Sequence, residues 1–379
     1  MSVLWYPTVK ECPVKGLAGM GGGIFWSSMG GGSAPASVTV VASVKNNTSP
    51  SPAGTYTDGQ SFYLRGYDTG LNVKNPAGIS YRNSRYMQVG ADSVILARVW
   101  GSAGGSGNSN FGGKGGGGQF AEATITFDSD GGTIWYMVGA GGGWGDGTQI
   151  GSGGWGGGGS CGKEQGTALP GNSGTAFAAG GDASGFPVNR SAQGGGGGGC
   201  TGLFVKAGGS GQTADGNDAS LANELLLAGA GGGYGGYSPG HIGAGGGQSH
   251  PNSATATAGG VNNTSDATNG GAGFGGAGVQ RGGGGGSGLW GGSGGNDGAY
   301  GGQPGSRQGG GGGYGNTSPG TSVSGVTVTS ATLSAATQSV VANNGGTGYI
   351  SSPISYGTCS SQATVMGGSG LIQITVSDP

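Results

Sequence analysis

The sequence predicts an all-β protein, in which a β-sandwich, jelly-roll-like framework carries long glycine-rich insertions packed as polyglycine II helices. Glycine supplies 105 of the 379 residues. Its runs alternate with short segments rich in β-branched and aromatic residues, which favour strands. No segment has the apolar spacing of a helix. This interleaving indicates an ordered scaffold rather than a disordered tail.

Two other glycine-rich architectures do not fit the order of the residues. A collagen helix needs glycine at every third position and abundant proline, but the chain has only 14 prolines and runs such as residues 195–199 break the repeat. A glycine-serine linker lacks large apolar residues. This chain has 7 Trp, 13 Tyr and 9 Phe, several of them placed singly inside glycine tracts.

Polyglycine II helices are the remaining ordered arrangement for these tracts. Such a helix makes no internal hydrogen bonds, so its backbone groups must be paired with neighbouring helices. Ordering one residue costs about 1–2 kcal/mol, whereas a net hydrogen bond returns about 0.5–1.5 kcal/mol. Only a complete bundle can therefore be stable. Aromatic residues at its edges, with Trp144 and Trp155 as the best candidates, are expected to seal it.

The N-terminal residues 1–36 are predicted to form an attachment or assembly arm. Its apolar side chains lie near glycines and suit docking onto another subunit. An ordinary first strand of the same domain is the alternative. The candidate assembly residues are Trp5, Tyr6, Ile24, Phe25 and Trp26.

Residues 37–92 have an ordinary glycine content and form a β-rich N-terminal part. Strands are predicted at residues 37–45, 61–65 and 79–89, with a loop over residues 46–54 because of its Asn, Ser and Pro content.

Residues 93–379 are predicted to form the glycine-rich domain, in which strands lead directly into glycine tracts. Residues 128–132 (DSDGG) read as a hairpin turn, and the C-terminal strands fall within residues 326–376. The predicted strands of this part are 93–100, 119–127, 133–138, 203–207, 224–228, 326–333, 339–342 and 370–376.

The order of these elements resembles the glycine-rich domain of bacteriophage tail-fibre and adhesin proteins and, more distantly, that of the extracellular part of the anaplastic lymphoma kinase receptor. The matching segments are residues 89–105 (VGADSVILARVWGSAGG), 115–126 (GGGGQFAEATIT), 134–143 (IWYMVGAGGG), 225–236 (LLLAGAGGGYGG) and 367–376 (GGSGLIQITV). The resemblance implies a β-sandwich that holds glycine-helix insertions. Some phage tail-tip adhesins use stacked polyglycine helices to present receptor-binding loops. The arm lies outside the resemblance.

Charge and hydropathy exclude several partner classes. The 14 Lys and Arg balance 16 Asp and Glu, and only 8% of the residues are charged. Phosphate binding requires clustered basic residues, so no nucleic-acid partner is expected. No apolar run approaches the roughly 20 residues that cross a bilayer, and the start does not have the pattern of a secretory signal.

The four cysteines are Cys12, Cys161, Cys200 and Cys359, too far apart in sequence for a CxxC metal pattern. Cys161 and Cys200 each follow a glycine-rich stretch. A disulfide between these two would link two glycine segments, and buried thiols are the alternative.

Catalytic chemistry is poorly supported by the sequence. The only histidines, His241 and His250, lie in Gly/Ser/Pro-rich segments without a triad or metal spacing. Asp128 and Asp130 faintly resemble a calcium loop, but a hairpin turn uses the same residues. We therefore expect a non-enzymatic protein with no catalytic residues, no metal and no cofactor.

Binding through aromatic residues is better supported. Aromatic side chains on adaptable glycine turns suit recognition of sugars or surface proteins. Packing over glycine-helix edges is the alternative role. The candidate recognition residues are Tyr234, Tyr237, Trp290, Tyr300 and Tyr314.

These features predict a phage virion protein, a tail fibre or adhesin, that binds a host-surface glycan or protein. Its partners would be copies of itself and other virion proteins. The alternative is an extracellular filament subunit that polymerises through its arm. A polysaccharide hydrolase would need a carboxylate pair in a groove, and the 16 acidic residues are scattered.

Overall fold

The computed structural model contains eleven strands and no helix in the residues that it describes. An all-β fold is therefore confirmed, and no helix in the described part of the chain is long and apolar enough to cross a membrane. The described residues are 35–40, 54–65, 84–107, 113–145, 150–162, 171–184, 194–205, 219–236, 243, 245–247, 270–279, 282–295, 309–320, 323–336 and 366–377.

The strands form two antiparallel sheets. The first, sheet A, has six strands in the order β2-β1-β4-β7-β8-β9. Their bounds are β1 Ser37–Val40, β2 Gly54–Thr57, β4 Ser84–Val89, β7 Gly132–Met137, β8 Thr201–Val205 and β9 Glu224–Ala228.

Sheet B has five strands in the order β10-β6-β5-β11-β3. Its central strand β5 pairs with β6 on one side and with the C-terminal β11 on the other, so the chain closes its fold with its last strand. The bounds are β3 Ser61–Arg65, β5 Val94–Trp100, β6 Phe120–Phe127, β10 Val326–Ser334 and β11 Leu371–Ser377.

One apolar core lies between the two sheets and makes the fold a β-sandwich. Alternate residues of β5 and β6 are buried, as expected for strands with one face against a core. Both sheets contribute, for example through Ile95 and Ile125 from sheet B and Ile134 from sheet A, all fully buried. Side chains from the two facing sheets therefore hold the sandwich together, through the burial of apolar area.

A second apolar cluster covers the outer face of sheet A. Trp135 of β7 and Phe204 of β8 point away from the core, and they pack against Trp155 and Phe177 of the glycine-rich segments. The rings of Phe177 and Phe204 meet edge to face at 5.5 Å between centroids. Because both faces of β9 are covered, all five of its residues are buried.

Most of the predicted strands are found with small shifts in their bounds. The strand β2 was not predicted: the loop was expected to reach residue 54, and residues 55–57 were left without an assignment. Gly54–Thr57 is a largely exposed strand that forms by pairing with β1. Residues 41–45, 79–83 and 339–342, predicted as strand, lie outside the described residues. The predicted boundary at residue 92, between the β-rich part and the glycine-rich domain, does not separate two sheets. Strands from the two sides of it pair in both sheets, β4 with β7 in sheet A and β3 with β11 in sheet B.

Candidate functional site

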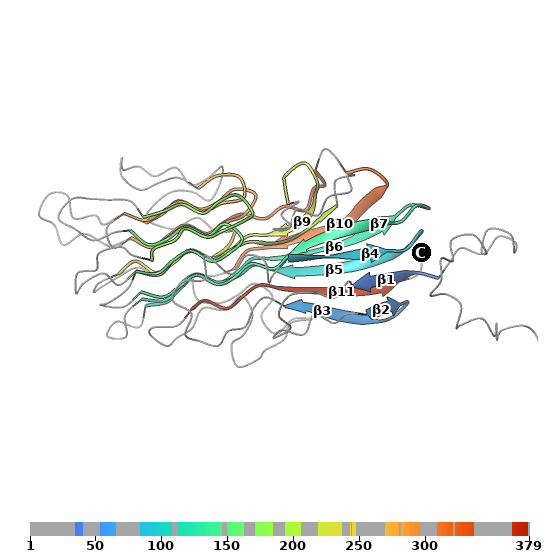
Figure 1. The fold of residues 1–379 in the computed structure, drawn as a ribbon, viewed down its shortest axis with the longest axis horizontal. Coiled ribbons are helices and arrows are strands. Elements are labelled where there is room, and N and C mark those ends of the chain that lie inside the picture. The colour runs from blue at the N-terminus through green and yellow to red at the C-terminus, as the bar shows by residue number, and fades with distance from the viewer. Residues whose placement is uncertain are drawn as a thin grey trace, which may run out of the picture.

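The glycine tracts continue the strands beyond one end of the sandwich. β5 leads into residues 101–107, β7 into 139–145 and β9 into 229–236, and Figure 1 shows the tracts running side by side away from the sheets. We call the hydrogen-bonded set of tracts the glycine bundle. It comprises residues 101–107, 113–119, 139–145, 150–162, 194–200, 229–236, 273–279, 282–295, 309–313 and 366–370.

Backbone amides of the tract 194–200 point in three directions in turn. Amides three residues apart share a partner, so Gly195 and Gly198 both donate to the tract 229–236, at 2.8 and 2.9 Å. The other donors follow the same repeat: Gly196 and Gly199 donate to Gly143 and Ala140, and Gly197 and Cys200 donate to Gly159 and Gly156.

The carbonyls of this tract repeat in the same way and face further segments. Gly195 and Gly198 accept from the tract 282–288, while Gly196 and Gly199 accept from the tract 101–107. The tract is thus hydrogen-bonded to six described segments, which are 101–107, 139–145, 150–155, 156–162, 229–236 and 282–288. The amides of residues 195–200 and the carbonyls of residues 194–199 are all paired although the whole tract is buried.

Close approach of neighbouring backbones explains why these positions are glycine. A Cβ at Gly197 would lie 1.9 Å from the carbonyl oxygen of Gly285, and one at Gly141 would lie 1.7 Å from that of Gly367. The tracts can hydrogen-bond at this spacing only because no side chain stands between them. Glycine is therefore a packing requirement of the bundle.

Four polar side chains complete the hydrogen bonding where the sheets pass into the bundle. The Gln119 Oε1 atom accepts from the amides of Gly229 and Gly315 at 3.0 and 2.6 Å. The buried hydroxyl of Ser102 donates to backbone carbonyls, and the Thr201 hydroxyl accepts from the Gly139 amide. Ser287 is the fourth. No pattern in the sequence predicted these roles.

Ser287 joins the tract 282–288 to the tracts that contain Gly156 and Cys200. Its hydroxyl donates to the Gly156 carbonyl at 2.5 Å and accepts from the Cys200 amide at 2.6 Å. Replacing Ser287 by Ala is expected to lower the free energy of unfolding by about 1–3 kcal/mol, because buried backbone groups lose a partner. Urea unfolding of the full chain followed by tryptophan fluorescence measures this change.

Ser293 provides a matched control for that substitution. It is also a buried serine of a glycine tract, but its hydroxyl has no hydrogen-bond partner among the described residues. Ser293→Ala is expected to leave the stability unchanged or to raise it slightly. Equal losses in the two variants would contradict the assigned role of Ser287.

The predicted disulfide between Cys161 and Cys200 is wrong. Both residues are buried thiols. Cys161 packs against Ile150 and Ala183, whereas Cys200 belongs to the cluster on the outer face of sheet A and its Sγ atom lies 3.3 Å from the Gly156 carbonyl oxygen. The two thiols thus lie in different surroundings. The tracts that contain them are joined by backbone hydrogen bonds and not by a disulfide.

The prediction that Tyr234 lies on a recognition surface is also wrong. Its side chain is only 2% exposed. A Cβ at Gly113 would lie 2.3 Å from atoms of the Tyr234 ring, so the ring covers the neighbouring tract. Trp144 and Trp155, which were expected to seal the bundle, are both buried, as predicted.

Trp290 and Tyr314 are brought together at the surface of the bundle. They are the exposed large hydrophobic residues of the described chain, at 42% and 37% exposure. They form an isolated antiparallel bridge in which the Tyr314 amide donates to the Trp290 carbonyl at 2.8 Å. Their separation by 24 positions in sequence gave no sign of this pairing.

The remaining predicted site residues lie outside the described residues. These are the recognition candidates Tyr237 and Tyr300, the arm residues Trp5, Tyr6, Ile24, Phe25 and Trp26, and the histidines His241 and His250. Their roles stay predictions.

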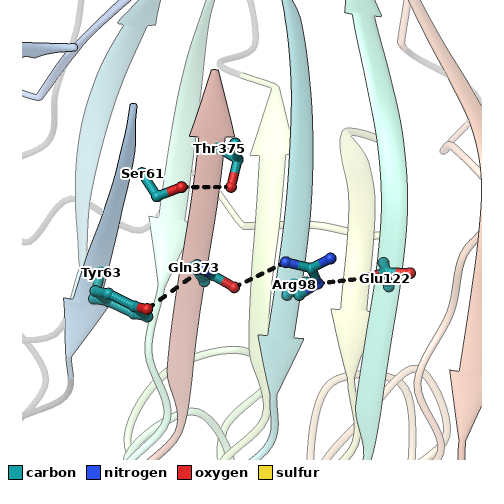
Figure 2. A network of polar contacts seen from close by, with 6 residues as sticks. All are labelled: Ser61, Tyr63, Arg98, Glu122, Gln373 and Thr375. Carbon is teal, nitrogen blue, oxygen red and sulfur yellow. Dashed lines mark hydrogen bonds and ion pairs between the residues drawn. The ribbon is translucent and has the colours of Figure 1, made fainter. Parts of the chain in front are cut away.

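A row of polar side chains crosses the outer face of sheet B (Figure 2). Arg98 of β5 lies between Glu122 of β6, with which it forms an ion pair, and Gln373 of β11, to which it donates at 3.2 Å. Gln373 in turn donates to the Tyr63 hydroxyl on β3. The row links four neighbouring strands across the sheet, and its residues are engaged with one another.

Two buried ionisable groups near the bundle have raised pKa values. Burial raises the pKa of the Cys200 thiol to about 12, which keeps it protonated and a poor nucleophile. Burial also raises the pKa of Glu224 to about 8. Within the described part of the chain, no group of three His, Cys, Asp or Glu could hold a metal ion.

Asp128 and Asp130 belong to a turn, but the prediction of a hairpin is wrong. The strand before the turn, β6, lies in sheet B, and the strand after it, β7, lies in sheet A, so the turn carries the chain from one sheet to the other. The Asp128 carboxylate accepts from the Asp130 amide at 3.1 Å, and the Asp128 carbonyl accepts from the amide of Gly131. Gly131 has a φ of 65°, which glycine adopts without strain.

Comparisons with known proteins do not assign a role, so the glycine bundle and its exposed aromatic pair are the basis for one. No family model matches the sequence, and no curated protein matches it either.

Proposed function

We propose that this chain is a non-enzymatic structural protein of a phage virion, a tail-fibre or adhesin-like component that binds a host surface. A jelly-roll-like sandwich would carry the glycine tracts as polyglycine II helices. The observation that carries the proposal is the three-residue repeat of hydrogen-bond partners along the tract 194–200. That repeat is the one expected of a three-residue-per-turn helix with outward-facing backbone groups.

A bundle of this kind suits the mechanical role of an adhesin. Each tract is tied to several others by backbone hydrogen bonds, so a load on one is shared by its neighbours. Backbone pairing between the tracts needs few charged side chains, in keeping with a chain of which only 8% is charged. The resemblance of the strand-to-glycine junctions to phage tail-fibre proteins favours the same role.

Localisation on the virion tests this proposal. Antibodies raised against the full chain are expected to label the tail fibres or tail tip of the phage that encodes it, seen by immunogold electron microscopy. The purified chain is also expected to reduce phage adsorption by competing for the host surface. Virions without label would refute the proposal.

The alternative is an extracellular filament subunit, favoured by the apolar composition of residues 1–36. Deleting residues 1–32 separates the two roles. A filament subunit would lose polymerisation, whereas a fibre protein would keep its fold and oligomeric state but lose attachment to the virion. Light scattering and electron microscopy of the deletion variant distinguish these outcomes.

A further inference from the structure

The exposed aromatic pair Trp290–Tyr314 has the properties of a built binding platform. Directly opposed residues of an antiparallel bridge project their side chains to the same face. Trp290 and Tyr314 therefore lie together on one side of the bridge. Together they present apolar ring surface to solvent at 42% and 37% exposure.

The backbone beneath the pair is fixed by the glycine bundle and by the sandwich. A Cβ at Gly288 would lie 2.3 Å from the Tyr314 carbonyl oxygen, so the two segments are in close contact. Leu289, next to Trp290, packs against the apolar cluster on sheet A. Asn316 exchanges two backbone hydrogen bonds of 2.8 Å with Leu227 of β9. Such a preorganised surface loses little entropy when a ligand binds.

The described segments that carry the pair contain no charged residue, and the buried Glu224 of β9 lies near Asn316 with its pKa raised by burial. Residues 270–279, 282–295, 309–320 and 323–336 contain no Asp, Glu, Lys or Arg. The polar groups that follow Tyr314 are the neutral side chains of Asn316, Thr317 and Ser318, which are at least partly exposed. The Asn316 amide is bonded to the backbone of Ser318, so the hydroxyl groups of Thr317 and Ser318 are the candidates for a ligand. The site therefore offers aromatic faces together with uncharged hydrogen-bonding groups.

The size of the platform decides between ligand classes. Specific protein partners bury about 800 Å² on each side, whereas an aromatic side chain presents about 150–250 Å² even when wholly buried on binding. Two half-exposed rings fall well short of a protein interface. They match a sugar ring, whose C–H face is apolar and packs against the negative face of an aromatic ring, and whose hydroxyls suit neutral hydrogen-bonding groups.

We infer that Trp290 and Tyr314 form a binding site for a neutral hexose unit of a surface polysaccharide. The inference rests on the proposed function in one respect, because a host-surface adhesin is the setting in which the chain would meet such a glycan. The site lies on the side of the bundle next to β9, through the pairing of Leu227 with Asn316.

Oligosaccharide titration of the full chain tests the inference. The probes are unbranched hexaoses of glucose, mannose and galactose, and binding is measured by calorimetry and by protection of tryptophan fluorescence from acrylamide quenching. At least one probe is expected to bind. Trp290→Ala and Tyr314→Ala are each expected to weaken its binding about tenfold or more, and Trp290→Phe is expected to restore part of it.

Two controls separate a binding role from a structural one. Thr327→Ala changes an exposed residue of β10 on sheet B and is expected to leave binding unchanged. The Trp290 and Tyr314 variants are expected to keep the circular dichroism spectrum of the parent at the assay temperature, because neither side chain belongs to the apolar core between the sheets. Failure of all three hexaoses to bind, or equal binding by parent and Trp290→Ala, would overturn the inference, as would capture by host-surface protein alone.

The outcomes for the site and for the virion role are distinguishable. If sugar binding depends on Trp290 but antibodies against the chain do not label virions, the sugar site is supported and the phage proposal is refuted. If the antibodies label virions but the chain binds sugars equally well without Trp290, the phage proposal is supported and the sugar site is refuted.

Discussion

Replacing Gly197 by Ala is expected to lower the free energy of unfolding by about 3 kcal/mol or more. The added methyl group would lie 1.9 Å from the Gly285 carbonyl oxygen and 2.3 Å from its carbon. These are backbone atoms, which cannot rotate away as a side chain can. The tract would have to move, and its hydrogen bonds to Gly159 and Gly154, both of 2.8 Å, would be weakened together.

Gly311 supplies the matched control in the same bundle. A Cβ there would meet the Ser293 amide nitrogen at 3.2 Å and the Gly292 Cα atom at 3.3 Å, so the neighbouring tract need shift by only a few tenths of an ångström. Alanine also reduces the conformational freedom of the unfolded chain, which favours folding by about 0.4–1 kcal/mol. Gly311→Ala is therefore expected to change stability by less than about 1 kcal/mol.

Urea unfolding followed by circular dichroism and by tryptophan fluorescence compares the two variants. The urea midpoint of Gly197→Ala is expected to lie far below that of the parent, and the midpoint of Gly311→Ala is expected to lie close to it. Similar midpoints for both variants would mean that the tracts do not pack at the spacing described. The comparison thus tests the packing of the bundle independently of its biological role.

The sequence predicted the strands and their junctions with glycine well, because these signals are local. β9 begins and ends at the predicted residues, and β5 and β7 differ by one residue or less at each end. β8 begins at Thr201, before the predicted start at residue 203, because Thr201 and Gly202 pair with Ala228 and Leu227. Glycine has no strand preference, so such an extension depends on the partner strand.

The roles of single residues in the glycine tracts could not be predicted in the same way. Tyr234 and Tyr314 both follow runs of glycine, yet one is buried and the other is exposed. The difference depends on which segments lie beside each tract. Those neighbours come from distant parts of the chain, such as Gly113 beside the Tyr234 ring. No pattern within the tract carries that information.

Glu224 is an example of a buried charge that the sequence pattern concealed. It opens the apolar strand β9 and is fully buried, and neither carboxyl oxygen makes a hydrogen bond of normal geometry to the described residues. Burial raises its pKa from 4.5 to about 8, and the nearby Asn316 amide offsets this only in part. The carboxyl group is therefore protonated in the folded chain at neutral pH.

This pKa makes folding stability depend on pH. Between pH 4.5 and about 8 the folded chain holds a proton on Glu224 that the unfolded chain releases. The contribution of Glu224 to stability is therefore fully present below pH 4.5, falls as the pH rises through this window, and is lost above about pH 8. Each pKa unit corresponds to about 1.4 kcal/mol, so the loss over the whole window is at most roughly 5 kcal/mol.

Replacing Glu224 by Gln is expected to remove this dependence. The variant keeps the shape of the side chain but does not ionise, so its stability should match the parent within about 1 kcal/mol at pH 5 and exceed it by several kcal/mol at pH 8.5. Urea unfolding at half-unit intervals from pH 5 to 8.5 measures both proteins.

The difference between the two pH profiles isolates Glu224 from the other titrating groups. The two histidines occur in both proteins. Cys200, which lies near Glu224, has a pKa raised from 9.0 to about 12 and does not titrate in the folded chain within this range. Parallel profiles for the parent and Glu224→Gln would mean that the carboxyl group is solvated or paired. A steeper loss of stability in the parent than in Glu224→Gln would show that the folded chain holds a proton on the Glu224 carboxyl group.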